Sequence, residues 1–97
     1  VEGFLDLARR DGLRAAAVGR IATNAPEGGF YVKPALLAEV DPRHTLAQEE
    51  VFGPVLVATR FRDEAEALAL ADGTAYGLVA GVWTRDLGRG LRLARRI

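Results

Sequence analysis

The sequence predicts an α/β fold built around a parallel β-sheet. Two observations support this prediction. The spacing of apolar residues switches repeatedly between the period of 3.6 that is typical of helices and the short apolar runs that are typical of strands. The segments between these stretches are mostly short. Strands and helices that alternate with short joints favour a parallel sheet with right-handed crossovers.

The first part of the chain is expected to form a helix, a short strand and an extended segment. Residues 2–10 place apolar side chains at helical spacing, and Gly12 is suited to end that helix. The small apolar run 14–18 predicts a short strand. Residues 19–29 contain Asn, Pro and several Gly, and they predict an exposed loop. Residues 31–40 predict an extended strand that is broken by its proline, as in an edge or bent strand.

Three elements are expected in the middle of the chain. Residues 45–50 predict a short helical turn, and the apolar run 55–59 predicts a strand buried in a parallel sheet. Asp63 is typical of a helix start. The helix predicted over residues 64–71 carries its acidic side chains near its beginning, where the helix dipole favours negative charge.

Two further elements are expected near the end. Residues 78–83 predict another buried strand, and Asp86 opens a last helix in which Leu87, Leu91 and Ala94 share a face. The chain contains no Met and stops within this helical run without a Gly or Asn terminator. We therefore expect it to be a fragment of a longer protein.

Composition limits the possible classes of function. With 97 residues, of which 49% are hydrophobic, the chain can build one modest core, in one domain or part of one. The 13 basic and 13 acidic residues cancel, so no net field favours nucleic acid or an anionic membrane. No apolar stretch approaches a membrane span of about 20 residues, and no segment resembles a signal peptide. The absence of Cys suits a reducing, cytoplasmic location.

The inventory of side chains excludes several catalytic centres. The chain has no Ser, no Cys and a single His, so it cannot assemble a Ser-His-Asp or Cys-His arrangement. His44 could act as a base, but a solvated loop histidine is the favoured interpretation. A lone His with scattered carboxylates offers no zinc-like spacing. We expect no catalytic residue and no metal site within these residues.

Two patterns in the last helix have weaker implications. Gly88-Arg89-Gly90 follows an expected strand and opens a helix, as in the dinucleotide fingerprint, but Leu93 stands where that fingerprint needs its third glycine. We reject this match and expect the glycines to allow close packing. The arginines of this segment share one helix face, which could contact phosphates but is expected to be a solvated face. They are Arg85, Arg89, Arg92 and Arg96.

The most informative run is Gln48-Glu49-Glu50-Val51-Phe52-Gly53-Pro54. An ionised Glu can accept hydrogen bonds from both hydroxyls of a ribose, and Phe52 could cover an adjacent ring. Gly53 lets the backbone approach a ligand, and Pro54 fixes φ and starts an extended segment. The same run also fits a helix end, a buried Val–Phe pair and a turn into a strand. Both interpretations stay open on these residues alone.

Four motifs in a fixed order resemble the aldehyde dehydrogenase superfamily, in the part of its catalytic domain that follows the nucleophile. They are Gly29-Phe30-Tyr31-Val32-Lys33-Pro34, the run 48–55, Ala71-Asp72-Gly73-Thr74-Ala75-Tyr76-Gly77-Leu78 and Gly81-Val82-Trp83-Thr84-Arg85-Asp86. The resemblance extends from Gly29 to Ile97. It implies that residues 1–97 are a parallel-sheet, three-layer fragment of the catalytic domain, without the nucleotide-binding domain and the nucleophile segment.

The resemblance also implies a chemistry. In this family a Cys thiolate attacks an aldehyde, hydride passes from the thiohemiacetal to the nicotinamide of NAD or NADP, and a Glu-activated water releases the carboxylate. Both of those catalytic residues lie outside this chain. Glu50 resembles the carboxylate that binds the nicotinamide ribose, and Phe52 resembles the aromatic residue beside the nicotinamide. The implied partners are an aldehyde substrate and further copies of a homo-oligomeric full-length protein, with no nucleic acid and no membrane.

Two positions depart from the family's pattern. His44 stands where the family usually carries Met, and Asp72 stands where it prefers Asn, so local packing and any side-chain amide bond are expected to differ. An alternative function, from another class, is a non-catalytic α/β module that pairs with other chains through an edge strand near residues 31–37.

Overall fold

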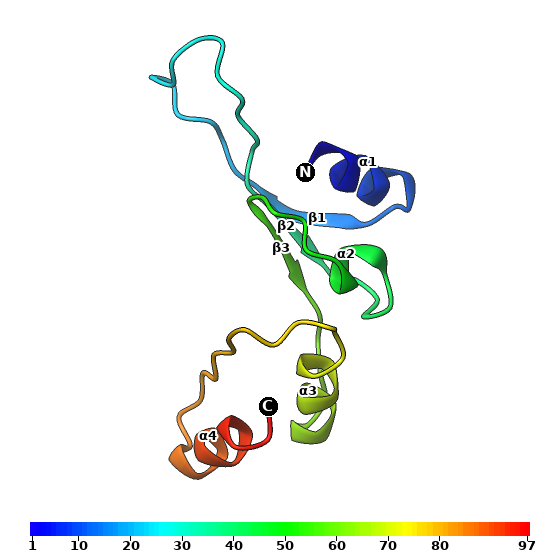
Figure 1. Ribbon diagram of the computed structural model, residues 1–97, viewed down its shortest axis with the longest axis vertical. Coiled ribbons are helices and arrows are strands. Elements are labelled where there is room, and N and C mark those ends of the chain that lie inside the picture. The colour runs from blue at the N-terminus through cyan, green and yellow to red at the C-terminus, as the bar shows by residue number, and fades with distance from the viewer. The chain divides into compact units, whose positions relative to one another are not determined.

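The structure, a computed structural model, describes residues 1–97 as two compact units, Val1–Thr59 and Arg60–Ile97. The elements of the first unit are, in chain order, α1 (Glu2–Arg10), β1 (Arg14–Val18), β2 (Ala35–Ala38), α2 (Thr45–Gln48) and β3 (Val55–Ala58) (Figure 1). The second unit contains α3 (Glu64–Ala71) and α4 (Leu87–Ala94). None of these helices has the length and apolar content needed to cross a bilayer.

The first helix and the first strand lie where the sequence predicts them. The helix α1 carries Glu2 in its first turn and two arginines in its last turn, which suits the helix dipole. Gly12 follows with φ +70°, a left-handed conformation that glycine adopts without a steric penalty. This turn leads the chain directly into β1.

The sheet has the strand order β1-β2-β3 and is mixed rather than parallel. The central strand β2 pairs parallel with β3, with Ala35 opposite Val55, and antiparallel with β1, with Ala35 opposite Val18. The prediction of a wholly parallel sheet is therefore wrong for β1. The connections explain the difference: a loop can join antiparallel strands, whereas parallel strands need a crossover, which the segment containing α2 supplies between β2 and β3.

The core of the first unit lies between one face of the sheet and two helices. Ala8 of α1, Leu46 of α2, Leu37 of β2 and the following Val40 are all buried. Full burial of a Leu or Val side chain contributes about 1.5–3 kcal/mol. Figure 1 shows both helices on the same side of the strands. This unit has two layers, so the expected three-layer arrangement is not formed within it. Further partly buried side chains pack against this core: Phe4, Leu13, Ala47, Val51, Val55 and Val57.

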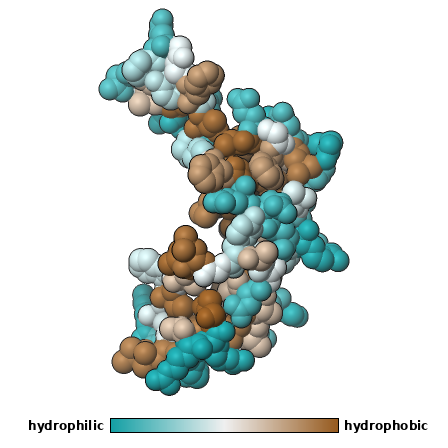
Figure 2. Space-filling model, in the orientation of Figure 1, coloured by the Kyte–Doolittle hydropathy of each residue, from teal (hydrophilic) through white to brown (hydrophobic).

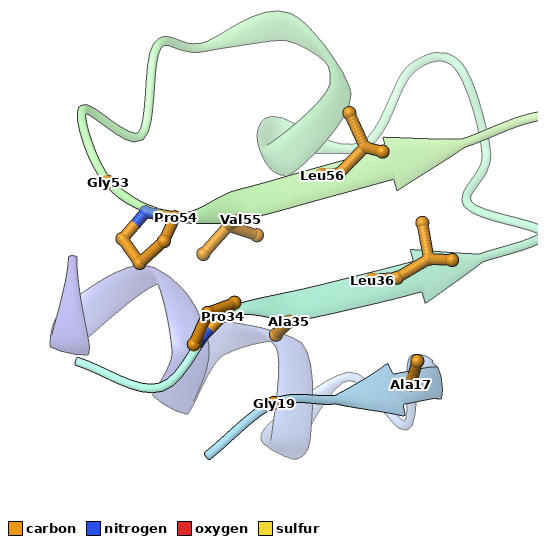
Figure 3. Close-up of a pocket in the computed structure, with 9 residues that line it drawn as sticks. All are labelled: Ala17, Gly19, Pro34, Ala35, Leu36, Gly53, Pro54, Val55 and Leu56. Carbon is orange, nitrogen blue, oxygen red and sulfur yellow. The ribbon is translucent and has the colours of Figure 1, made fainter. Parts of the chain in front are cut away.

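The other face of the sheet is uncovered and apolar. Ala17, Leu36 and Leu56 project to this side (Figure 3), and the side chain of Leu56 is 65% exposed. Along β3 the residues alternate between partly buried and exposed. The predicted strand at residues 55–59 is therefore confirmed, but it is covered on one face only.

The segment from residue 19 to residue 34 contains no helix or strand, as expected for its first part. The extended strand predicted over residues 31–40 is shorter, because regular pairing begins only at Ala35, after Pro34. Proline lacks the backbone N–H that a strand ladder uses. The resulting strand β2 lies between two others, so the edge strand required by the alternative interaction-module function is not formed at residues 35–37.

The two helices of the second unit begin at the predicted cap residues. Asp63 Oδ1 accepts a hydrogen bond from the Glu66 N–H at 2.9 Å, and Asp86 Oδ1 accepts one from the Arg89 N–H at 3.0 Å. Each bond satisfies a backbone donor that a helix start leaves without an intrahelical partner. Leu68 of α3 is the buried apolar residue of this unit.

The buried strand predicted over residues 78–83 is wrong. These residues form no regular element, and the side chains of Leu78 and Trp83 are 98% and 97% exposed. A strand is stable only when a neighbouring strand accepts and donates its backbone hydrogen bonds. The unit Arg60–Ile97 contains no other strand that could do so.

Candidate functional site

The short helix α2 leads directly into the acidic run. The N–H of Glu49 donates a hydrogen bond to the Thr45 carbonyl oxygen at 2.8 Å, and Glu49 then adopts an extended conformation with φ −109° and ψ 147°. The helical turn predicted over residues 45–50 thus ends at Gln48. Glu50 consequently lies outside the helix, in the segment between α2 and β3.

This segment borders a hollow of about 360 Å³ on the same face of the sheet as the core. We refer to it as the acidic hollow, because it combines two carboxylates and an aromatic ring with aliphatic walls. The structure therefore brings together Glu50 and Phe52, the two residues that the sequence predicts as binding residues. The lining residues are Leu46, Glu49, Glu50, Val51, Phe52, Gly53, Val55 and Val57.

The carboxylate of Glu50 is exposed at this hollow and has no hydrogen-bond or ion-pair partner within the chain. An ionised carboxylate offers two oxygens and about four acceptor positions. The neighbouring Glu49 likewise has no side-chain partner within the chain, whereas some carboxylates of this unit are paired with arginine, as in the contact of Asp41 Oδ2 with Arg43 Nη2 at 2.8 Å. Glu50 can therefore accept hydrogen bonds from two donors of a ligand.

The residue Phe52 is 87% exposed and its backbone has φ +54°. The interpretation of a buried Val–Phe pair is therefore wrong for Phe52. A left-handed conformation costs a residue with a Cβ about 1–2 kcal/mol. Strained backbones of this kind persist where the surrounding structure enforces them, and they gather at ligand sites. Because the ring of Phe52 is exposed, internal packing of this unit does not offset the cost.

The turn after Phe52 is fixed by contacts with two other segments. The Pro54 carbonyl oxygen accepts a hydrogen bond from the Ala35 N–H at 2.9 Å, which ties the start of β3 to the start of β2. Gly53 lies against the Val1 side chain, and a Cβ on Gly53 would lie 2.9 Å from Val1 Cγ1. A side chain at position 53 would therefore require the Val1 side chain to move. The turn predicted for Gly53 and Pro54 is confirmed.

A second hollow, of about 420 Å³, lies on the uncovered face of the sheet (Figure 3). Its walls contain no charged or polar side chain that could orient a polar ligand. The acidic hollow is the better candidate because it pairs apolar walls with specific acceptors. The residues around this second hollow are Ala17, Gly19, Pro34, Ala35, Leu36, Gly53, Pro54, Val55 and Leu56.

His44 is not the solvated loop residue that the sequence predicts. Its side chain is only 16% exposed. Its Nδ1 accepts a hydrogen bond from the Leu46 N–H at 3.1 Å, and its Nε2 lies 3.1 Å from Asp11 Oδ2. His44 is therefore the N-cap of α2. Its position immediately before the predicted helical turn was a usable signal, although Ser, Thr, Asp and Asn are the usual capping residues.

Of the four arginines expected on one helix face, Arg89 and Arg92 lie in α4, whereas Arg85 and Arg96 lie outside it. Arg89 Nε and Arg92 Nη2 both donate to Glu64 Oε1 of α3, each at 2.8 Å. These contacts lower the pKa of Glu64, with Arg92 the larger cause, and raise the pKa of Arg92. Two of the four arginines therefore link helices within the second unit. No group of three or more His, Asp or Glu side chains gathers as in a metal site.

The family model for the aldehyde dehydrogenase family matches residues 1–97. The match thus includes residues 1–28, which precede the four motifs of the sequence. An aldehyde dehydrogenase of Deinococcus radiodurans is 47% identical over 95 residues, which cover 97% of this chain and 18% of that protein. The chain spans about one fifth of the length of such relatives.

Solved structures match over nearly the whole chain. A crystal structure from Burkholderia cenocepacia, of a protein provisionally assigned as an aldehyde dehydrogenase, is 63% identical with a TM-score of 0.93 and covers 98% of this chain and 20% of its own. The structure of a Mycobacterium tuberculosis aldehyde dehydrogenase complexed with NAD+ is 38% identical with a TM-score of 0.84. It covers 99% of this chain and 20% of its own.

Proposed function

The chain belongs to the aldehyde dehydrogenase family, and we propose that it positions the nicotinamide end of NAD or NADP within a longer polypeptide that oxidises an aldehyde to a carboxylate. This proposal rests on one observation. The free carboxylate of Glu50 and the exposed ring of Phe52 border the same hollow. The coenzyme supplies the hydride acceptor, and the residues of this chain supply its placement.

The acceptor chemistry of Glu50 fits the sugar of the coenzyme. A ribose presents two adjacent hydroxyl donors, and a carboxylate with both oxygens available can accept a hydrogen bond from each. Charge-assisted bonds of this kind are shorter and about twice as strong as neutral ones. In this proposal Glu50 fixes the position and rotation of the sugar, and it takes no part in bond making or breaking.

The ring of Phe52 fits the next part of the coenzyme. An exposed aromatic face two residues from the carboxylate offers a surface for the flat nicotinamide ring, and aromatic pairs contribute about 0.5–1.5 kcal/mol beyond the area that they bury. Hydride transfer requires reacting atoms about 3–3.5 Å apart and aligned. Holding the sugar and the ring together restricts the coenzyme to orientations that allow this approach.

The reacting groups are proposed to come from other parts of the longer polypeptide. The chain contains no cysteine, so the thiol nucleophile of the family chemistry has no candidate among residues 1–97. We assign Glu50 and Phe52 as coenzyme-binding residues and no residue of this chain as catalytic. Residues 1–97 are proposed to be part of the catalytic domain.

The Glu50→Gln substitution in the complete polypeptide tests this function. The amide keeps the size of the side chain but loses the charge, and a hydrogen bond to a charged group contributes about 1.5–3 kcal/mol. We expect coenzyme-dependent aldehyde oxidation to fall about tenfold to a hundredfold. Hydrolysis of an activated ester, which needs acylation but no coenzyme, is expected to stay within about twofold of the unmodified enzyme.

The neighbouring Glu49→Gln substitution is the matched comparison, because it removes the same charge one residue earlier in the same segment. We expect a smaller loss of oxidation from it. Equal losses from the two substitutions would contradict the assignment of Glu50. An equal fall of oxidation and ester hydrolysis in Glu50→Gln would contradict a coenzyme-specific role for this carboxylate.

A further inference from the structure

The His44 imidazole connects the end of α1 with the beginning of α2. Its Nε2 lies 3.1 Å from Asp11 Oδ2, and Asp11 is the C-cap residue of α1. Its Nδ1 accepts the Leu46 N–H at 3.1 Å. The side chain is largely buried, with 16% of its surface exposed. Both ring nitrogens are therefore used, and they contact elements far apart in the sequence.

These two contacts define the protonation state of the ring. Because the Leu46 N–H is a donor, Nδ1 must be unprotonated, and the single proton of a neutral imidazole then lies on Nε2, where it points to the Asp11 carboxylate. If Nδ1 were protonated, its N–H would face the Leu46 N–H, and neither donor could accept a hydrogen bond from the other. The cap therefore exists only in the neutral form of the ring.

The helix α2 depends on this cap because it is a single turn. Helices this short are not stable by themselves. The remaining support comes from the burial of Leu46, which is 3% exposed, and from backbone bonds such as that of the Gln48 N–H to the His44 carbonyl oxygen at 3.1 Å. Glu50 follows only two residues after the helix ends. One helical turn thus separates the capped start of α2 from the segment that borders the acidic hollow.

We infer that His44 is a positioning residue for the segment from Glu50 to Phe52, and that it acts through the capping of α2 in its neutral form. This inference rests on the proposed function, because its consequence is measured at the coenzyme. His44 does not line the acidic hollow, and the inference assigns it no contact with the coenzyme. Its effect is to keep the carboxylate and the aromatic ring in the orientation that binds.

Two aspartates near the His44 ring, Asp11 and Asp41, have pKa values below the usual value of a carboxyl group. Hydrogen bonds from the His44 ring and, secondarily, from Arg10 lower the pKa of Asp11. Hydrogen bonds from Arg43 lower the pKa of Asp41 from 3.8 to about 2. Asp41 therefore stabilises its turn above pH 3.8, and this contribution is lost only as the pH falls through about 2. Arginine side chains stay charged throughout.

The test uses three forms of the complete polypeptide: the unmodified enzyme, His44→Ala and His44→Asn. Alanine removes the cap, whereas asparagine is among the best N-cap residues and does not titrate. At about pH 8 we expect His44→Ala to raise the KM for the coenzyme about fivefold with ester hydrolysis unchanged, and His44→Asn to restore the KM to within about twofold.

A second measurement needs no coenzyme. Hydrogen–deuterium exchange of residues 45–52 in the coenzyme-free protein is expected to be faster in His44→Ala than in the unmodified enzyme, and normal in His44→Asn. An unchanged KM in His44→Ala, or a failure of His44→Asn to restore the KM, would overturn the inference. Glu50→Gln separates the two proposals: an unchanged rate of aldehyde oxidation and an unchanged KM there contradict the coenzyme site itself, whereas an impaired Glu50→Gln with no effect at His44 contradicts only the positioning role.

Discussion

At the scale of single residues, Phe52 combines two unfavourable features, an exposed aromatic ring and a left-handed backbone. Neither feature stabilises the unit Val1–Thr59 by internal packing. Sites that bind ligands often retain such costs, because the conformation that binds is not the conformation of lowest energy for the free chain. Stability and binding are therefore expected to respond in opposite directions to substitution at this position.

Comparing Phe52→Gly with Phe52→Ala separates the two effects. Both substitutions remove the ring, but only glycine adopts φ +54° without steric cost. We expect Phe52→Gly to exceed Phe52→Ala by about 1–2 kcal/mol in the free energy of unfolding, as measured by chemical denaturation. Both variants are expected to weaken coenzyme binding. Equal stabilities would show that position 52 is not strained.

The residues of the candidate site could be predicted from the sequence to different degrees. Glu50 and Phe52 stand out because a carboxylate and an aromatic residue precede a Gly-Pro turn, and the structure brings them to one hollow. The role of His44 could not be predicted, because its partner Asp11 lies 33 positions earlier and the pairing depends on how α1 and α2 pack on the sheet. The positive φ of Phe52 was also unforeseen, since propensity favours glycine there.

At the scale of elements, helices were predicted better than strands. The start of α3 is determined locally, by Asp63 and by the apolar spacing that follows it. The strand expected at residues 78–83 depended on a partner that the unit Arg60–Ile97 does not contain. The direction of β1 likewise depends on a pairing between residues far apart in sequence. Local sequence carries helix signals, but it does not carry strand partners.

The two ends of α3 provide an element-scale prediction, because an aspartate lies at each. Asp63 caps the first turn through its bond to the Glu66 N–H, whereas Asp72 is the C-cap residue, where the helix dipole disfavours negative charge. We expect Asp63→Ala to destabilise α3 by about 1 kcal/mol and Asp63→Asn to be nearly neutral. Asp72→Ala is the matched control, with an expected gain of about 0.3–1 kcal/mol.

Hydrogen exchange of the α3 amide groups measures these changes directly, because it reports the stability of one element rather than of the whole chain. Asp63→Ala is expected to destabilise α3 and Asp72→Ala to stabilise it. Because the two effects have opposite signs, the comparison tests the position of each aspartate in the helix. Destabilisation of similar size from Asp63→Ala and Asp72→Ala would show that the aspartates act through the general charge of the chain and not through the ends of α3.

At the scale of the whole molecule, each of the two units exposes large hydrophobic side chains. Hydrophobic residues lie at the surface of both units (Figure 2). They include Phe30, Leu56, Leu78, Val79 and Trp83. Exposed apolar surface of this extent is typical of segments that pack against other protein.

The isolated chain of 97 residues should therefore behave differently from the same residues within a longer polypeptide. We expect it to self-associate with increasing concentration, as measured by sedimentation velocity, because association covers the apolar faces. We also expect no reduction of NAD or NADP with any aldehyde, because the chain has no cysteine. Turnover by the purified chain would contradict the proposed division of roles, and a monomer at all concentrations would contradict the expected self-association.

The segment between β1 and β2 has a consequence for how relatives can differ in length. Residues 19–34 are held at their base, where the Gly19 N–H donates to the Pro34 carbonyl oxygen at 2.7 Å, and they form no helix or strand beyond it. Doubling the length of such a connection costs only about 0.6 kcal/mol in closure entropy. Insertions and deletions can therefore accumulate here during evolution without shifting the strand register on which the turn at Pro54 depends.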